Sequence, residues 1–185
     1  MNLMKLTSRA FTMLCLSLVI CSGCKKDEAR HYDLLPPDPE DVTSTATITV
    51  NYDNSGGPTA NEGSPKVIDG DLDSKFLNNY NAAMYMQLGF NKAQCVTTYT
   101  LTSANDAPTR DPKNWTITAS NDGENWVTLD TQTDQAFAAR RETKTYEFEN
   151  GTAYTYYRMN VTANGGSTLF QLAEWRVIAI PLLDQ

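Results

Sequence analysis

From Thr45 onward, apolar and polar residues alternate in short segments rich in Thr, Val, Tyr and Trp, and turn-forming residues separate these segments. No long stretch has the apolar period of about 3.6 residues that is typical of an amphipathic helix. Alternation with a period of two predicts strands that bury one face. The expected strands, eight in number, are Ala46–Asn51, Met84–Phe90, Val96–Ser103, Trp115–Ser120, Trp126–Asp130, Thr143–Glu149, Tyr154–Thr162 and Leu169–Ile178. Such a series predicts an all-β sandwich.

One connection between these strands has a clear turn signal. Asn121-Asp122-Gly123 separates the fourth expected strand from the fifth, and all three residue types tolerate the positive φ that a tight primed turn requires. We therefore expect a hairpin at this point. Trp115, Trp126 and Trp175 lie within expected strands, which favours core positions over an exposed aromatic platform.

The N-terminal segment has the pattern of a secretory signal. Lys5 and Arg9 precede the apolar run Ala10–Ile20, which is shorter than the roughly 20 residues that span a bilayer. Ser22-Gly23 before Cys24 resembles the lipobox of bacterial lipoproteins, in which the cysteine becomes lipidated. The charged residues that follow resemble the signal that sends Bacteroidetes lipoproteins to the outer face of the outer membrane. We expect a lipoprotein signal peptide over residues 1–23 and a lipid anchor on Cys24, facing the cell exterior.

Residues 24–45 contain three prolines, several acidic residues and little periodicity, so we expect a flexible tether. The folded domain is then expected over residues 46–180. Removing residues 1–23 leaves 13 basic against 22 acidic residues, a net charge of −9. This charge disfavours nucleic acid and anionic membrane surfaces as partners. Cys95 is the one cysteine left in the domain, which excludes an internal disulfide.

The stretch Lys66–Ser74 has the composition of a cation-binding loop. Asp69, Asp71 and Asp73 alternate, Gly70 permits a tight turn, and Ser74 adds a hydroxyl. Calcium takes about six to eight oxygen ligands, so a distant carboxylate such as Glu174 is needed to complete the shell. An EF-hand is excluded, because its required glycine and glutamate positions hold Ser74 and Tyr80 when Asp69 is counted first. The same composition also suits an ordinary surface turn, and spacing alone leaves both interpretations open.

Four segments together resemble the discoidin family, also called factor 5/8 type C domains. Ser120 with Asp122–Trp126 resembles the signature S-x-D-G-x-x-W, and Ser64–Gly70 resembles the early calcium loop of the family. Met86–Gly89 resembles the strand W-I-Q-V-D-L-G, and Gln171–Glu174 resembles the closing A-E strand. They occur in the order of the family between Thr47 and Ile178. The resemblance implies an eight-stranded antiparallel jelly-roll β-sandwich of the discoidin or galactose-binding-domain type.

The resemblance also implies a structural calcium ion that joins the early loop to the last strand. Carried over by position, the ligands are the Lys66 carbonyl, the Asp69 carboxylate, the Asp71 carbonyl, the Ser74 hydroxyl and carbonyl, the Ala173 carbonyl and the Glu174 carboxylate. We expect such an ion to stabilise the fold rather than to take part in a reaction.

In the sugar-binding branch of the family, the family 32 carbohydrate-binding modules, the ligand lies on loops at one end of the sandwich. Two of these loops correspond to Leu77–Ala82 and Ala104–Pro112. Planar polar side chains can form paired hydrogen bonds to sugar hydroxyls, and an aromatic ring can cover a pyranose. The candidate ligand-binding residues are Asn78, Asn79, Tyr80, Asn105, Asp106, Arg110 and Phe170.

Alternatives remain for several of these residues. Arg110 could instead form an ion pair with Asp111 that holds the loop, and Asn78 and Asn79 could be turn residues. Arg140-Arg141 is interpreted as a solvated or packing feature. Galactose binders of the family often use a histidine in the first loop, and the one histidine of this chain, His31, lies in the expected tether.

These patterns predict a non-catalytic carbohydrate-binding domain. Nucleophilic catalysis usually needs a base such as histidine beside the nucleophile, and neither His31 nor Cys95 has a local partner of that kind. The expected partners are glycans, the membrane through the lipid on Cys24, and neighbouring surface proteins. A protein-binding adhesion or assembly subunit of the outer membrane and a structural spacer remain as alternatives.

Overall fold

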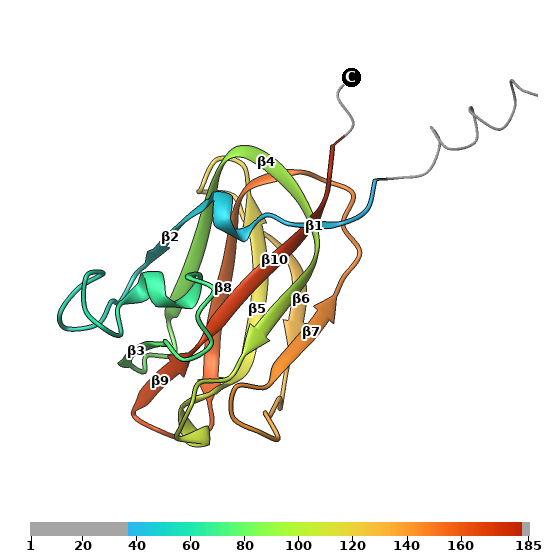
Figure 1. Ribbon diagram of the computed structural model, residues 1–185. Coiled ribbons are helices and arrows are strands. Elements are labelled where there is room, and N and C mark those ends of the chain that lie inside the picture. Colours follow the sequence, from blue (N-terminus) through green and yellow to red (C-terminus); the bar gives the residue numbers. More distant parts are fainter. Residues whose placement is uncertain (1–36, 183–185) are drawn as a thin grey trace, which may run out of the picture. The chain divides into compact units, whose positions relative to one another are not determined.

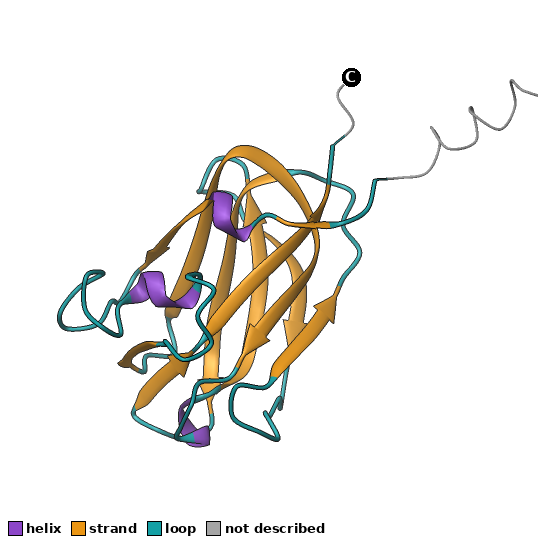
Figure 2. Cartoon of the chain, viewed as in Figure 1, coloured by secondary structure: helices purple, strands orange, loops and turns teal. Residues whose placement is uncertain are grey.

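The computed structural model describes residues 37–182, so the expected signal peptide and Cys24 lie outside the described part of the chain. The strands are β1 (Glu40–Asp41), β2 (Ala46–Val50), β3 (Phe76–Asn79), β4 (Met84–Thr102), β5 (Pro112–Ser120), β6 (Val127–Gln132), β7 (Thr143–Glu147), β8 (Tyr154–Asn164), β9 (Leu169–Leu172) and β10 (Glu174–Ile180). Three short 3-10 helices, η1 (Thr43–Thr45), η2 (Ser64–Val67) and η3 (Pro108–Arg110), connect them (Figure 2). Within residues 37–182, no helix has the length and apolar character needed to cross a membrane.

Eight strands form two antiparallel layers that share β4, and β3 and β9 form a separate two-stranded sheet (Figure 1). The first half of β4 pairs with β2 and β8, and its second half pairs with β10 and β7. One layer is therefore β1, β10, β4 and β7, and the other is β2, β4, β8, β5 and β6. The expected strands Met84–Phe90 and Val96–Ser103 are thus one long strand that bends between Gly89 and Gln94. The predicted all-β antiparallel sandwich is confirmed.

The core fills the space between the two layers. Alternate residues of β4, namely Met84, Met86, Leu88 and Phe90, point inward, as the period-two pattern predicts. Trp115 and Trp175 are almost fully buried, which confirms their expected core positions. The predicted hairpin at residues 121–123 is also present. On either side of this turn, β5 and β6 pair from Ala119 with Val127 to Trp115 with Gln132.

The strand β3 was missed by the sequence prediction, which placed Leu77–Ala82 in a loop. β3 pairs with β9, and its inward residues Phe76 and Asn78 are buried. A four-residue strand with two asparagines carries little intrinsic β preference, so only its tertiary pairing defines it. The expected strand Leu169–Ile178 is divided at Ala173 into β9, which pairs with β3, and β10, which pairs with β4.

The expected tether ends earlier than predicted, because residues 40–45 belong to the folded domain. Glu40 and Asp41 pair with the end of β10. Thr43 is fully buried, and its hydroxyl accepts a hydrogen bond of 2.7 Å from the Val177 amide. These contacts are made with residues more than a hundred positions away, so the local composition gave no sign of them.

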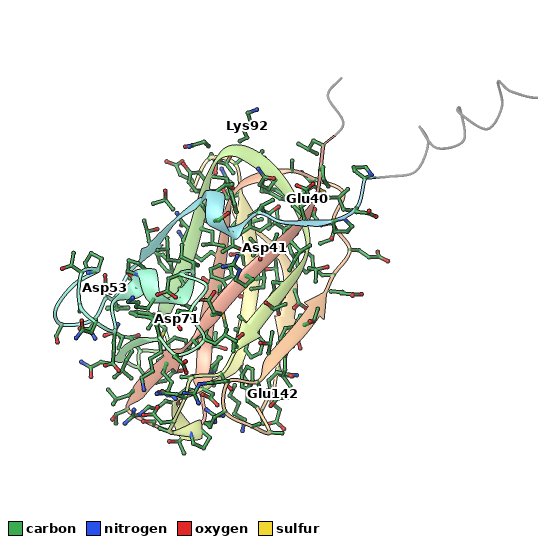
Figure 3. The ribbon with its side chains drawn as sticks, viewed as in Figure 1. Glu40, Asp41, Asp53, Asp71, Lys92 and Glu142 are labelled. Carbon is green, nitrogen blue, oxygen red and sulfur yellow. The ribbon has the colours of Figure 1, made fainter. Side chains whose placement is uncertain are left out.

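The two ends of the sandwich differ. β1, the end of β10 and the bend of β4 near Lys92 lie at one end (Figures 1 and 3). The opposite end is formed by η3 and by the connections 80–83, 103–111, 133–142 and 165–168, with Glu142 among them. We call this second end the loop end. The chain therefore enters the domain far from the loop end.

Candidate functional site

The loop of residues 66–74 folds onto the first residue of β10. Gly70, with φ +78°, adopts the left-handed conformation that glycine tolerates best, and its amide donates a hydrogen bond of 2.7 Å to Glu174 Oε1. The two residues are separated by 104 positions in the chain. The expected closure of the early loop onto the last strand is thus present as a direct contact.

The other predicted metal ligands gather around the same point. The Ser74 hydroxyl lies 3.0 Å from both carboxylate oxygens of Asp69 and 3.4 Å from the Lys66 carbonyl oxygen. The Asp71 carbonyl accepts a hydrogen bond from the Ser74 amide, while the exposed Asp71 side chain accepts one from the Asp73 amide. Ala173 is buried directly before Glu174. Lys66, Asp69 and Ser74 therefore form one cluster of oxygens beside Glu174, and the Asp71 carbonyl and Ala173 are their neighbours along the chain.

One buried oxygen of this cluster is not satisfied, although the Lys66 ammonium pairs with Asp69 Oδ2 at 3.1 Å. Glu174 is 1 % exposed, and its Oε2 atom has no hydrogen-bond partner within residues 37–182. The nearest cation is Arg176, whose Nη1 atom lies 3.5 Å from this oxygen in a loose ion pair. Burial, together with the nearby Asp69 carboxylate, raises the pKa of Glu174 to about 7. A buried oxygen without a partner beside a second carboxylate is the environment that a bound cation would satisfy.

The donor set fits calcium rather than a softer metal. Within residues 37–182 no three acidic, histidine or cysteine side chains come together, so carbonyl and hydroxyl oxygens would have to supply the remaining ligands. Calcium accepts such mixed oxygen shells. The residues present are therefore chemically suited to the ion that the sequence predicts.

Three segments meet at the loop end. The Tyr80 amide donates to the Thr168 carbonyl at 2.9 Å, and the Ser167 amide donates to the Thr109 carbonyl at 3.1 Å. The Gly165 amide donates to the Asp111 carbonyl at 3.0 Å. The turn 165–168 therefore connects the end of β3 to η3, so that both predicted ligand loops border one surface.

This junction depends on the absence of a side chain at Gly165. A Cβ atom built there would lie 2.8 Å from the Thr109 Cα and 2.9 Å from the Pro108 carbonyl oxygen. We expect Gly165→Ala to lower the free energy of unfolding by about 2 kcal/mol, because backbone atoms must move apart. Gly151→Ala is the matched control, since nothing lies within 4 Å of its built Cβ. Equal urea unfolding midpoints for the two variants would show that the junction is not tightly packed.

Five of the predicted sugar-binding residues lie at the surface of the loop end, and two of them are held in place by a lysine. Asn79, Asn105 and Asp106 are exposed, while Tyr80 and Arg110 are half-buried. The buried Lys75 donates to Asn105 Oδ1 at 3.1 Å and to Asp106 Oδ1 at 2.8 Å. Within residues 37–182, Arg110 forms one ion pair, a long one of 3.9 Å with Asp106 Oδ2, so its guanidinium can still bind a ligand.

Two predicted sugar-binding residues are instead structural. Phe170 is fully buried and packs edge-to-face against Phe76 with 6.3 Å between ring centroids, so it is not an aromatic platform. Its position in β9 points it into the core. Asn78 is 7 % exposed, and its side-chain amide donates to the Tyr52 carbonyl at 2.5 Å. Asn78 was assigned wrongly because its segment is a strand rather than a loop. Phe170 was expected in a strand, and its side chain points into the core rather than toward the loop end.

The ion pair that holds the 104–112 loop involves a residue that the sequence did not single out for this role. Arg140 donates to Asp111 through two hydrogen bonds, with Nη1–Oδ1 at 2.9 Å and Nη2–Oδ2 at 2.5 Å, and Nη1 also reaches the Asp106 carbonyl at 3.0 Å. The proposed Arg110–Asp111 pair does not form. Burial raises the pKa of the Asp111 carboxyl, and the Arg140 guanidinium opposes that shift. The partners are 29 residues apart, and their pairing has no local signal.

Trp126 is not a core residue, contrary to the sequence prediction. It is half-buried, and its ring lies 3.8 Å from the guanidinium carbon of Arg158, measured to the ring centroid. The indole nitrogen donates to the Gly123 carbonyl at 3.1 Å. The residue directly precedes β6, so it stands in the turn outside the sandwich rather than between the sheets.

The loop end also has two hollows, one of which has the volume of a typical ligand site. A cavity of about 540 Å³ lies beside η3, with Asp111, Lys113, Gln135 and Asn164 among its lining residues. A shallower hollow of about 180 Å³ lies between Asn54, Asn79 and Leu169. Small-molecule sites commonly fall between about 300 and 1,000 Å³. The sequence gave no reason to include Lys113 or Gln135, because their approach to η3 depends on the fold.

Comparisons with known proteins match this architecture. The sequence profile of the F5/8 type C domain matches residues 44–175. A family 32 carbohydrate-binding module from Clostridium perfringens, in complex with GalNAc-β-1,3-galactose, superposes with a TM-score of 0.62 and 17 % identity over 75 % of this chain and 99 % of that one. An F5/8 type C domain from Bacteroides fragilis superposes with a TM-score of 0.63 and 15 % identity over 80 % of this chain and 100 % of that one. At these identities the structures show a shared fold.

A plant enzyme shares a short segment with the chain. The peptide-N(4)-(N-acetyl-β-glucosaminyl)asparagine amidase of Arabidopsis thaliana is 48 % identical over 59 residues, which are 31 % of this chain. The chain spans only 8 % of the length of that enzyme.

Proposed function

Because the chain belongs to the F5/8 type C domain family, we propose that it is a carbohydrate-binding domain without catalytic activity. The observation that carries this proposal is the polar surface formed by β3, η3 and the turn 165–168. The exposed Asn79 lines a hollow of about 180 Å³ and is followed by the half-buried Tyr80. The half-buried Arg110 ends η3, which borders the cavity of about 540 Å³. A family 32 module of the same fold is described with a bound disaccharide. The loop end of this chain supplies the planar polar groups and the ring that such a ligand needs.

The ligand surface is polar, which favours a glycan over a protein partner. A protein interface of the adhesion type would be expected to present a large apolar patch at the loop end. The exposed large apolar residues of the described chain are Tyr52, Leu72, Val127 and Leu182, which lie on four separate segments. The loop end instead carries asparagine, aspartate and arginine.

A structural calcium ion belongs to this proposal. Lys66, Asp69, Asp71, Ser74, Ala173 and Glu174 would hold it, and it would supply a positive charge between the Asp69 and Glu174 carboxylates. By joining the 66–74 loop to β10, the ion would stabilise the sandwich and leave the sugar-binding surface to other residues.

The proposed lipid anchor on Cys24 fits the position of the ligand surface. The described chain enters the domain beside β1, at the end of the sandwich opposite the loop end (Figure 1). A domain anchored in this way to the outer membrane would direct its glycan-binding surface away from the membrane. Radiolabelled palmitate should be incorporated into the wild-type protein and not into Cys24→Ala.

Glycan binding is tested by screening the purified protein on a glycan array in the presence of calcium. We expect binding that falls at least about tenfold in Arg110→Ala and Asn79→Ala, because each variant loses hydrogen bonds to sugar hydroxyls. Lys92→Ala is the control, since Lys92 lies at the opposite end of the sandwich (Figure 3). Absence of binding by the folded protein, or equal binding by all variants, would contradict the proposal.

A further inference from the structure

The outward face of the second sheet contains an arginine in an unusual position. Gln87, Arg158 and Thr118 lie side by side across β4, β8 and β5, and Tyr85, Asn160 and Thr116 form the neighbouring row. Arg158 is the only charged residue of these two rows. The other side chains are hydroxyls, amides and a phenol ring, so the surface around the guanidinium is polar and uncharged.

Aromatic rings and an amide hold the Arg158 guanidinium in a fixed plane. Its central carbon lies 3.8 Å from the Tyr85 ring centroid and 3.8 Å from the Trp126 ring centroid. Nε and Nη2 donate to Gln87 Oε1 at 3.2 and 2.7 Å. Trp126 is itself fixed by its hydrogen bond to the Gly123 carbonyl. The hydrogens of Nη1 have no partner among the described residues.

The lack of an acidic partner distinguishes Arg158 from the other arginines in residues 37–182. Arg110, Arg140, Arg141 and Arg176 each form an ion pair with an aspartate, and Arg158 forms none within that part of the chain. The chain as a whole carries a net charge of −7. An unpaired, half-buried cation in an acidic protein favours an anionic ligand, because the guanidinium would gain charge-assisted hydrogen bonds without losing an existing partner.

We propose that this face is a second glycan-binding surface, separate from the loop end, which binds a uronic acid residue through its carboxylate. The free edge of the Arg158 guanidinium donates to the carboxylate. The half-buried rings of Trp126 and Tyr85 border the sugar. Thr118 and Asn160 are neighbours on β5 and β8 beside the guanidinium, and they form hydrogen bonds to the sugar hydroxyls. The rings already fix the plane of the guanidinium, so little conformational entropy is lost when the carboxylate binds.

A sugar fits this surface better than an acidic peptide. The surface has one cation rather than a cluster, whereas acidic and phosphorylated peptide segments are typically bound by several arginines or lysines. Half-buried threonine, asparagine and glutamine side chains next to aromatic rings are suited to the alternating hydroxyls and apolar faces of pyranoses.

The test is isothermal titration of the purified protein with galacturonate, glucuronate and mannuronate oligosaccharides, in parallel with their methyl esters and with polyglutamate. We expect at least one free uronate oligosaccharide to bind about tenfold or more tightly than its ester and than polyglutamate. Arg158→Lys should weaken this binding about tenfold, because lysine keeps the charge and loses the planar pair of donors.

A control variant separates this site from a general charge effect. Lys92→Ala removes one exposed positive charge from the far end of the sandwich and should leave uronate binding unchanged. The glycan array tests the loop end with Arg110→Ala and Asn79→Ala, and the uronate titration tests this face with Arg158→Lys, so the two proposals can fail independently. Thermal unfolding of Arg158→Lys establishes that the sheet is intact. Absence of binding to all three uronates, equal binding of the esters or of polyglutamate, or unchanged binding in folded Arg158→Lys would overturn the proposal.

Discussion

Replacement of Arg140 by alanine should lower the free energy of unfolding by about 3 kcal/mol, one of the largest single effects expected in the domain. Asp111 is 4 % exposed, and Arg140 is its ion-pair partner through two hydrogen bonds. Removing one member of a buried ion pair leaves the other charge without compensation, which costs several times more than the loss of a surface pair. Urea unfolding at neutral pH measures the change.

The neighbouring residue supplies a matched control. Arg141 pairs with Asp73, and both side chains are exposed, so Arg141→Ala should cost about 0.5 kcal/mol or less. Equal losses in the two variants would contradict a buried, structural Arg140–Asp111 pair.

The loss of folding stability caused by Arg140→Ala should depend on pH. Without the guanidinium, burial raises the pKa of Asp111 further above its ordinary value, so the folded variant binds a proton more tightly than the unfolded chain. Stability held by such a group is present at low pH and is lost as pH rises through the folded-state pKa. The variant should therefore lose less stability relative to wild type at pH 4 than at pH 7.

Removal of calcium should lower the free energy of unfolding of the wild-type domain by about as much as Arg140→Ala. Binding at roughly 100 times Kd contributes about 3 kcal/mol, and for a domain of this size we expect EDTA to lower Tm by roughly 10 °C. Glu174→Gln should abolish the difference between calcium and EDTA, because it removes the charge of the only carboxylate that β10 contributes. In EDTA this variant should be at least as stable as wild type, since the glutamine oxygen can still accept from the Gly70 amide.

Asp71→Asn provides the control for the calcium experiment. The Asp71 side chain is exposed and accepts from the Asp73 amide, and only its main-chain carbonyl is assigned to the ion. The variant should therefore keep the full response to calcium. A wild-type Tm that is the same in calcium and EDTA would refute the calcium site. A calcium response retained in Glu174→Gln would show that the ion binds elsewhere in the protein.

The class of fold could be predicted because the sandwich buries one face of each long strand. Met84, Met86, Leu88 and Phe90 alternate with polar residues, and this pattern is visible without tertiary information. Elements defined only by their partners could not be predicted in this way. Thr43 is buried by contact with Val177, and Asn78 lies in a strand because β9 lies beside it.

The candidate sites follow the same division. The oxygen-rich Lys66–Ser74 loop and Glu174 were predicted together through a family resemblance, and the fold places them in contact. The Asp111–Arg140 pair and the Arg158 stack arise from residues that are far apart in sequence and have no motif in common. Their charges were visible in the sequence, but their partners were fixed only by how the strands and their connections come together in the fold.

Glycan binding at the loop end is tested most directly by NMR. The ¹⁵N-labelled protein is titrated with the glycan that scores highest on the array, and the amide chemical shifts are recorded at each concentration. The account predicts concentration-dependent shifts confined to residues 52–55, 78–82, 105–113, 134–137 and 165–169, which border Asn79, Arg110 and the adjoining hollows. Shifts confined to the 91–94 bend at the far end of the sandwich, or no shifts at all, would contradict it.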